Sequence, residues 1–288
     1  MDVLETIFRA AAEKRIALML DLDGAVVSRQ PGIHDPVTPD LGLEGHLLSL
    51  MGDGCPVAIN TGRPEKFIDN LFPNIRDNAA LLPFWASTET GAHIYDHGKN
   101  ILFQRAVPGI ERLRDTFKKE LAQYPGAIVE GHKMCAITIS LAAANDKQKA
   151  YDHMLAVCKT EAAAAQGINI IHVYKPYDAY IEIVPDGIHK GTASEKILAH
   201  PEFHGKVVVC FGDSNADENM MAVVNNPKTG AYTGYSIGVG AQSPAIAHKK
   251  VASPRESQGV IAALADLARQ KITPGQALQN VASCFLTL

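Results

Sequence analysis

The 288-residue sequence has few cysteines and none of the spacings that cysteine sites need. There are five, an odd number, and no two form a C-x-x-C pair. Neither a disulfide framework nor a cysteine-based zinc site is therefore expected. Three of them lie in apolar runs, where a cysteine usually behaves as a small buried hydrophobe. The five are Cys55, Cys135, Cys158, Cys210 and Cys284.

Three further features are missing, and each argues against a class of protein. Lys and Arg number 27 against 31 Asp and Glu, for a formal charge of -4, so no basic surface for nucleic acid is expected. No uncharged apolar run reaches membrane-spanning length. The N-terminus carries early acidic residues and lacks the basic start and apolar core of a signal peptide, so a cytoplasmic location is predicted. The sequence leaves the oligomeric state open.

What the sequence does contain is enough apolar material, 47% of its residues, for a full core. Three short runs are apolar at nearly every position, which indicates strands covered on both faces. Polar residues and then a helical pattern follow each run. The runs are residues 15–20, 56–60 and 206–211. This alternation predicts an α/β fold with a doubly wound, Rossmann-like parallel sheet.

Between the second and third runs the pattern changes. Shorter strands that alternate apolar and polar residues are interleaved with helical stretches at 109–124 and 147–165. We predict a smaller α+β domain at 92–185, inserted into a core domain made of 1–91 and 186–288. The tail after Lys271 is apolar enough to pack on the core, and the sequence assigns it no role.

Four polar segments begin at or near expected strand ends, where ligands bind in open α/β sheets. The first holds Asp21 and Asp23, two carboxylates that are costly to place together unless a cation or a proton separates their charges. One carboxylate can attack phosphorus, and a second can protonate the leaving oxygen. The pair alone could also be an acidic loop.

The second segment is Asn60-Thr61-Gly62-Arg63-Pro64, in which a hydroxyl and backbone N–H groups can form a small anion cradle. A plain turn with a threonine helix cap explains it equally well. The third is Lys190, which can direct a charge at phosphate, although most isolated lysines lie at the surface.

The fourth segment contains Asp213 and Asp217, four residues apart and directly after the third apolar run. Both can face one cation, and Mg²⁺ prefers such oxygen ligands. An acid in a first helical turn can instead stabilise the helix dipole, which explains Asp217 but not Asp213.

Taken in order, D-x-D-G, T-G-R, the lysine and G-D-S-x-x-D-E resemble the haloacid dehalogenase (HAD) superfamily of hydrolases over most of residues 15–265. The resemblance implies that Asp21 is the nucleophile and Asp23 the acid/base. It implies that Thr61 and Lys190 hold the transferring phosphoryl group, and that Gly62 and Arg63 bind the substrate.

The same resemblance implies a magnesium site. Its ligands are expected to be Asp21, the backbone carbonyl of Asp23, and Asp213, with Asp217 in support.

The position of the insert resembles the HAD subclass with an α/β (type IIB) cap, and within it the trehalose-6-phosphate phosphatase family is most similar. The stretches PVAINTGRP, YPGAIVEGHK and YIEIVPDGIHKG carry that likeness. In that family two acids and a lysine of the cap bind the disaccharide, which here implies Glu130, Lys133 and Glu182. One departure lies beside the nucleophile, because Ala25 stands where the family usually has threonine.

The expected function is therefore Mg²⁺-dependent hydrolysis of a sugar phosphate through an aspartyl-phosphate, with trehalose 6-phosphate as the best candidate. Another small phosphorylated metabolite, or a phosphomutase or phosphotransferase reaction, remains open. A glycosyltransferase also uses D-x-D but does not need Lys190 or the 212–218 segment. A non-catalytic module with an acidic pocket would not need the second acid or the cap.

Overall fold

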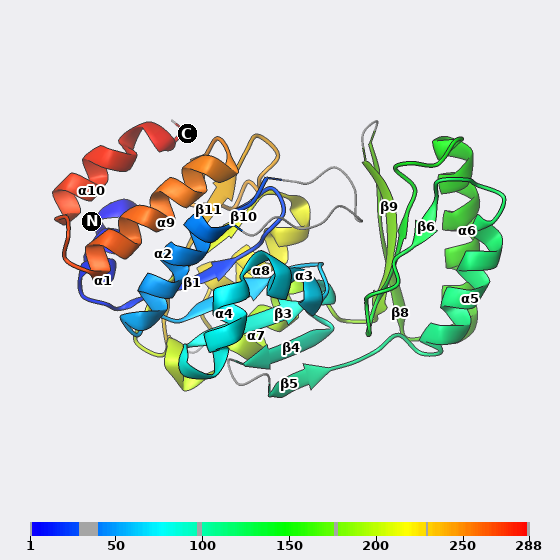
Figure 1. Ribbon diagram of the computed structural model, residues 1–288, viewed down its shortest axis with the longest axis horizontal. Coiled ribbons are helices and arrows are strands. Elements are labelled where there is room, and N and C mark those ends of the chain that lie inside the picture. Colours follow the sequence, from blue (N-terminus) through cyan, green and yellow to red (C-terminus); the bar gives the residue numbers. More distant parts are fainter. Residues whose placement is uncertain (1, 29–39, 97–99, 176–177, 229, 287–288) are drawn as a thin grey trace. The chain divides into compact units, whose positions relative to one another are not determined.

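The structure is a computed structural model that describes residues 2–28, 40–96, 100–175, 178–228 and 230–286 (Figure 1). By their internal contacts the described residues divide into two units. The smaller unit is Phe103–Ile188, and the larger unit holds the described residues before Phe103 and after Ile188.

The larger unit is built on a sheet of eight described strands, in which the pairs from β12 to β3 are parallel and β4 pairs antiparallel with β3. In spatial order they are β12 (Lys249–Val251), β11 (Thr233–Val239), β10 (Val207–Gly212), β1 (Ile16–Leu20), β2 (Val57–Asn60), β3 (Phe84–Thr88), β4 (His93–Asp96) and β5 (Ile101–Gln104).

Helices of the larger unit form two groups. The first comprises α1 (Val3–Ala12), α2 (Leu41–Gly52), α9 (Pro254–Ala268) and α10 (Pro274–Val281), in which α9 contacts each of the other three. The second comprises α7 (Lys190–Leu198) and α8 (Glu218–Asn225), which contact each other and β2, β3, β10 and β11. Two shorter helices, α3 (Glu65–Leu71) and α4 (Pro73–Asn78), follow β2.

Burial of β1 on both faces explains its continuous apolar run. Every residue of β1 is buried. Leu18 lies in one core cluster with Phe8 of α1, Leu47 of α2 and Leu264 of α9. Successive side chains of a strand point to opposite faces, so Met19 faces the other side of the sheet. Helices therefore cover both faces, which confirms the predicted α/β core.

The smaller unit has a four-stranded antiparallel sheet in the order β6 (Ile128–Val129), β7 (Ile137–Ser140), β9 (Asp178–Pro185) and β8 (Ile168–Lys175). Its helices α5 (Ile110–Leu121) and α6 (Lys147–Ala165) pack on one side of that sheet (Figure 1). Phe117 of α5, Met154 of α6 and Ile181 of β9 belong to its separate core cluster. The alternating strand pattern in the sequence follows from this one-sided burial.

The two units differ from the predicted domain boundaries at the start of the insert. We predicted 92–185, whereas the smaller unit begins at Phe103, and β4 and the first two residues of β5 belong to the larger unit. The sheet of the larger unit continues through the antiparallel strand β4, which lies beyond the residue where the sequence pattern changes. Among the described residues, no helix combines the length and apolar character needed to cross a membrane.

Candidate active site

Neighbouring strands β10, β1 and β2 bring three of the predicted polar segments to one edge of the sheet. Asp21 follows β1, Thr61 follows β2, and Asp213 follows β10. Because these strands are parallel neighbours, their carboxyl ends meet at the same edge. The Asp21 N–H donates to the Phe211 carbonyl of β10 at 3.0 Å, which ties the start of the first segment to the neighbouring strand.

Lys190 joins two of these segments through its side chain. Its Nζ lies 2.6 Å from Asp21 Oδ1 and 2.6 Å from Asp217 Oδ1. All three residues are buried, with Asp217 fully inaccessible to solvent. Lys190 is the first residue of α7, so the helix start delivers the ammonium directly to the sheet edge.

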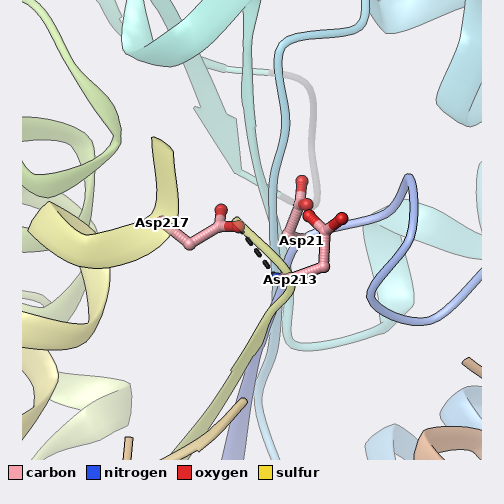
Figure 2. Close-up of side chains that lie close together, drawn as sticks. All are labelled: Asp21, Asp213 and Asp217. Carbon is pink, nitrogen blue, oxygen red and sulfur yellow. Dashed lines mark hydrogen bonds between the residues drawn. The ribbon is translucent and has the colours of Figure 1, made fainter. Parts of the chain in front are cut away.

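Asp217 is held on its other oxygen by the turn that follows β10. Asp217 Oδ2 accepts from the Asp213 N–H at 3.0 Å, the Ser214 N–H at 3.1 Å and Ser214 Oγ at 3.2 Å. Figure 2 shows the first of these bonds, with the carboxylates of Asp21 and Asp213 beside it. A Cβ added to Gly212 would lie 2.5 Å from Asp217 Cβ, so this close approach requires glycine.

The carboxylates of Asp21, Asp213 and Asp217 form a compact acidic group. One oxygen from each lies within 4.8 Å of the others. Burial raises the pKa of Asp21 well above its ordinary value, Asp217 and Asp213 raise it further, and Lys190 opposes the shift. Burial by itself lowers the pKa of Lys190, but Asp21 and Asp217 outweigh it and the pKa is raised. The lysine stays charged, and the group keeps an excess of negative charge.

This donor set suits a hard divalent cation. Three carboxylates against one ammonium leave negative charge for a cation to compensate, and carboxylate oxygens are the ligands that Mg²⁺ prefers. The predicted ligands Asp21, Asp213 and Asp217 are therefore brought together by the fold, and Asp23 lies two residues beyond Asp21 in the same loop.

The second predicted segment places its residues around Asp23. Both oxygens of Asp23 accept from Arg63, through Nε and Nη2, each at 2.7 Å. Thr61 is buried, and its Oγ1 accepts from the Arg63 N–H at 3.2 Å. Gly62 is half-buried in the same turn. Ala25, the departure from the family pattern, is buried, and its N–H donates to the Leu22 carbonyl at 3.2 Å.

The three predicted sugar-binding residues meet within the smaller unit. Lys133 Nζ lies 2.5 Å from Glu182 Oε1 and 4.0 Å from Glu130 Oε2. Thr138 Oγ1, which the sequence did not indicate, accepts from Lys133 Nζ at 2.6 Å. All four residues are buried.

Asn60 is a second residue whose role the sequence did not reveal. Its Nδ2 donates to the Lys190 carbonyl at 2.9 Å and to Ser194 Oγ at 3.1 Å, and Ser194 Oγ donates to the same carbonyl at 2.8 Å. The side chain at the end of β2 thus fixes the first turn of α7. A buried asparagine directly before Thr61, in a run that is otherwise apolar, was the available signal.

His189 caps the same helix. Its Nδ1 accepts from the N–H groups of Gly191 and Thr192 at 3.1 and 3.2 Å, while Thr192 Oγ1 donates to the His189 carbonyl at 2.8 Å. These bonds satisfy N–H groups that a helix start leaves without partners. The backbone at Lys190 is therefore fixed by Asn60, which donates to the Lys190 carbonyl, and by the cap that His189 forms on the same helix turn.

Comparison with known proteins gives the class of protein that carries this arrangement. The family model for trehalose-phosphatases matches residues 19–260. The C-terminal domain of trehalose-6-phosphate phosphatase from C. albicans is similar in structure, with a TM-score of 0.68 and 22% identity over 91% of this chain and 96% of that one. No curated protein sequence matches the chain.

Two further solved structures share the fold. A trehalose-6-phosphate phosphatase related protein has a TM-score of 0.65 at 20% identity, covering 89% of this chain and all of that one (100%). A haloacid dehalogenase-like hydrolase from Bacteroides thetaiotaomicron has a TM-score of 0.60 at 14% identity, covering 90% and 99%. These likenesses show the fold, an α/β core with an inserted domain, as the sequence predicted.

The chain belongs to the trehalose-phosphatase family, whose model matches most of its length. It is thus a phosphoric monoester hydrolase, which confirms the predicted enzyme class. The family implies a metal-dependent reaction on a small phosphorylated sugar.

The contacts of Asn60 predict that its loss damages catalysis more than folding. Asn60→Leu removes two hydrogen bonds to the start of α7, which lowers stability. It also removes Asn60 Oδ1, a buried oxygen with no hydrogen-bond donor among the described residues, which offsets part of that loss. Displacement of Lys190 by about 1 Å can reduce turnover by roughly 10²-fold. We expect kcat to fall by about 10- to 100-fold with a small change in melting temperature.

Asn78→Leu is the matched control, since its Nδ2 bonds to the Asn74 carbonyl at an exposed position. Steady-state phosphate release and thermal unfolding should be measured on both variants. Normal kcat in Asn60→Leu, with or without lower stability, would contradict the positioning role.

The raised pKa of Asp21 predicts how stability depends on pH when divalent cations are removed by a chelator. A carboxyl with a higher pKa in the folded chain stabilises the fold below its unfolded pKa, and this contribution is lost as pH rises through the folded pKa. Asp21→Asn removes that ionisation. Its melting temperature should exceed that of the wild type, by a margin that grows from acidic to neutral pH.

Asp77→Asn provides the control, because Arg76 lowers the pKa of Asp77 at an exposed ion pair. The melting temperature of Asp77→Asn should not exceed that of the wild type. The account of the acidic group is wrong if Asp21→Asn melts below the wild type at neutral pH in chelator.

Proposed function

We propose that this chain is a Mg²⁺-dependent phosphatase that converts trehalose 6-phosphate and water into trehalose and inorganic phosphate. The observation that carries the proposal is the buried bridge of Lys190 to Asp21 and Asp217, at 2.6 Å to each. The bridge supports the proposal because it brings an ionisable carboxylate, an ammonium and two further acids together at the edge of the sheet, in a chain of the trehalose-phosphatase family.

Asp21 is the proposed nucleophile. One of its carboxylate oxygens attacks phosphorus while the bond from phosphorus to the sugar oxygen breaks, which gives an aspartyl-phosphate. Lys190 lies against Asp21 and can offset the negative charge of the phosphoryl oxygens, and the buried hydroxyl of Thr61 can donate to one of them.

Asp23 is the proposed acid and base. In the first step it gives its proton to the leaving sugar oxygen, which is a poor leaving group without that proton. In the second step it takes a proton from water as the water oxygen attacks phosphorus. The bond from phosphorus to Asp21 then breaks, and phosphate leaves.

Asp21, Asp213 and the backbone carbonyl of Asp23 are the proposed Mg²⁺ ligands, with Asp217 in support. When bound, Mg²⁺ neutralises charge between the nucleophile and the phosphate. The excess negative charge of the acidic group supports this assignment.

Selection of the sugar is assigned to Glu130, Lys133 and Glu182 of the smaller unit. A buried lysine with two carboxylates nearby offers donors and acceptors suited to sugar hydroxyls. Thr138, bonded to the same Lys133 Nζ, belongs with this group.

A comparison of substrates tests the proposal. Free phosphate should be released from trehalose 6-phosphate in preference to glucose 6-phosphate, and only with Mg²⁺ present. Lys133→Met should raise KM for trehalose 6-phosphate by about 10- to 100-fold, as loss of a charged hydrogen bond predicts. Hydrolysis of p-nitrophenyl phosphate, which has no sugar, should change little.

Lys149→Met, a change at an exposed position of α6, serves as the control and should affect neither substrate. Equal loss on both substrates in Lys133→Met would remove the sugar-binding assignment. Transfer of the phosphoryl group to a second sugar, without free phosphate, would make the enzyme a phosphotransferase.

A further inference from the structure

Arg63 donates hydrogen bonds to both carboxylate oxygens of Asp23. Its Nε donates to Asp23 Oδ2 and its Nη2 to Asp23 Oδ1, each at 2.7 Å. A two-point contact between a planar guanidinium and a carboxylate fixes the rotation of the carboxylate as well as its position. The two side chains are about equally exposed, at 19% for Arg63 and 21% for Asp23.

Arg63 is itself held at three points. Its N–H donates to Thr61 Oγ1 at 3.2 Å, and its carbonyl accepts from the Glu89 N–H at 3.1 Å. Its guanidinium carbon lies 4.5 Å from the centre of the Phe67 ring, within the range of a cation–π contact. The arginine is therefore fixed by the fold before any substrate arrives.

The backbone of Asp23 is fixed separately. Asp23 forms a bridge with Val27, and the Gly24 N–H donates to the Val27 carbonyl at 2.8 Å. Gly24 has a φ of 83°, a left-handed conformation that favours glycine. This turn places the Asp23 backbone and leaves the rotation of its side chain to be set by another group.

We infer that Arg63 is a positioning residue that orients the Asp23 carboxylate for proton transfer, rather than a group that binds the substrate. The sequence indicated substrate binding for Arg63, but two of its donors are engaged by Asp23. The inference rests on the proposed function, in which Asp23 serves as acid and base.

This role makes the effect of Arg63 depend on the leaving group. A sugar oxygen needs the proton of Asp23 as it leaves, whereas p-nitrophenolate is stable without one. A change that misorients Asp23 should therefore slow the first step, measured by rapid quench as formation of the aspartyl-phosphate, with trehalose 6-phosphate and largely spare the first step with p-nitrophenyl phosphate. The second step, in which Asp23 acts as base, should slow equally for both substrates. Loss of a contact with the substrate should instead weaken the binding of both substrates, since both carry the same phosphate group.

The experiment compares Arg63→Met, Arg63→Lys, Asp23→Asn and the double variant Asp23→Asn/Arg63→Met on both substrates. General acid catalysis contributes about 10²- to 10⁴-fold. We expect Arg63→Met to lower kcat for trehalose 6-phosphate by at least about 10-fold, with KM nearly unchanged. Arg63→Lys keeps the charge but not the planar fork, so its loss should be intermediate.

The double variant isolates the coupling between the two residues. If Arg63 acts through Asp23, removing Arg63 from Asp23→Asn should cost nothing further, and the double variant should match Asp23→Asn. Arg76→Met is the control, because Arg76 makes a similar 2.7 Å contact with Asp77 at an exposed position of α4. It should leave both substrates unaffected.

Three results would overturn the inference, and they separate it from the proposed function. A higher KM for both substrates in Arg63→Met, with losses that multiply in the double variant, means that Arg63 binds the substrate. Normal kcat in Arg63→Met means that Asp23 needs no positioning. If the rate of aspartyl-phosphate formation in Asp23→Asn shows no dependence on the leaving group, the proposed role of Asp23 as acid fails and the inference fails with it. If Arg63→Met does not fold, Arg63→Lys and Arg63→Gln carry the same comparison.

Discussion

The ammonium of Lys190 between Asp21 and Asp217 is the contact on which the rest of the site depends. Two buried carboxylates repel each other and are costly to desolvate, and a cation 2.6 Å from each offsets part of that cost. Several neighbouring residues hold the Lys190 ammonium close to its two carboxylate partners. Asn60 and His189 fix the first turn of α7, and the absence of a side chain at Gly212 lets Asp217 approach.

The same arrangement explains why the site is chemically active. Burial, together with the neighbouring carboxylates, raises the pKa of Asp21. One ammonium does not balance three carboxylates, and the excess negative charge attracts a divalent cation. Such a site lowers the stability of the chain without its cation and becomes favourable when the cation binds. Asp23 lies outside this acidic group, paired with Arg63, so the two carboxylates of the D-x-D segment have different surroundings and different proposed roles.

Much of this was readable from the sequence, because it depends on local patterns. Apolar runs that end in polar residues located β1, β2 and β10, and the order of the parallel strands then made Asp21, Thr61 and Asp213 converge. Contacts between side chains distant in sequence were not readable. Asn60 bonds to a carbonyl 130 positions away, and Arg63 to an acid 40 positions away. The local sequence does not distinguish an arginine that pairs with a carboxylate from one that binds a phosphate of the substrate.

The central claim is that Asp21 carries the phosphoryl group between the two steps. The most direct measurement is rapid acid quench of the enzyme during turnover of trehalose 6-phosphate with Mg²⁺, followed by peptide mass spectrometry. The account predicts one phosphorylated peptide, with the phosphoryl group on Asp21, and none in Asp21→Asn. A phosphoryl group on another residue would contradict it, as would turnover by Asp21→Asn at the wild-type rate.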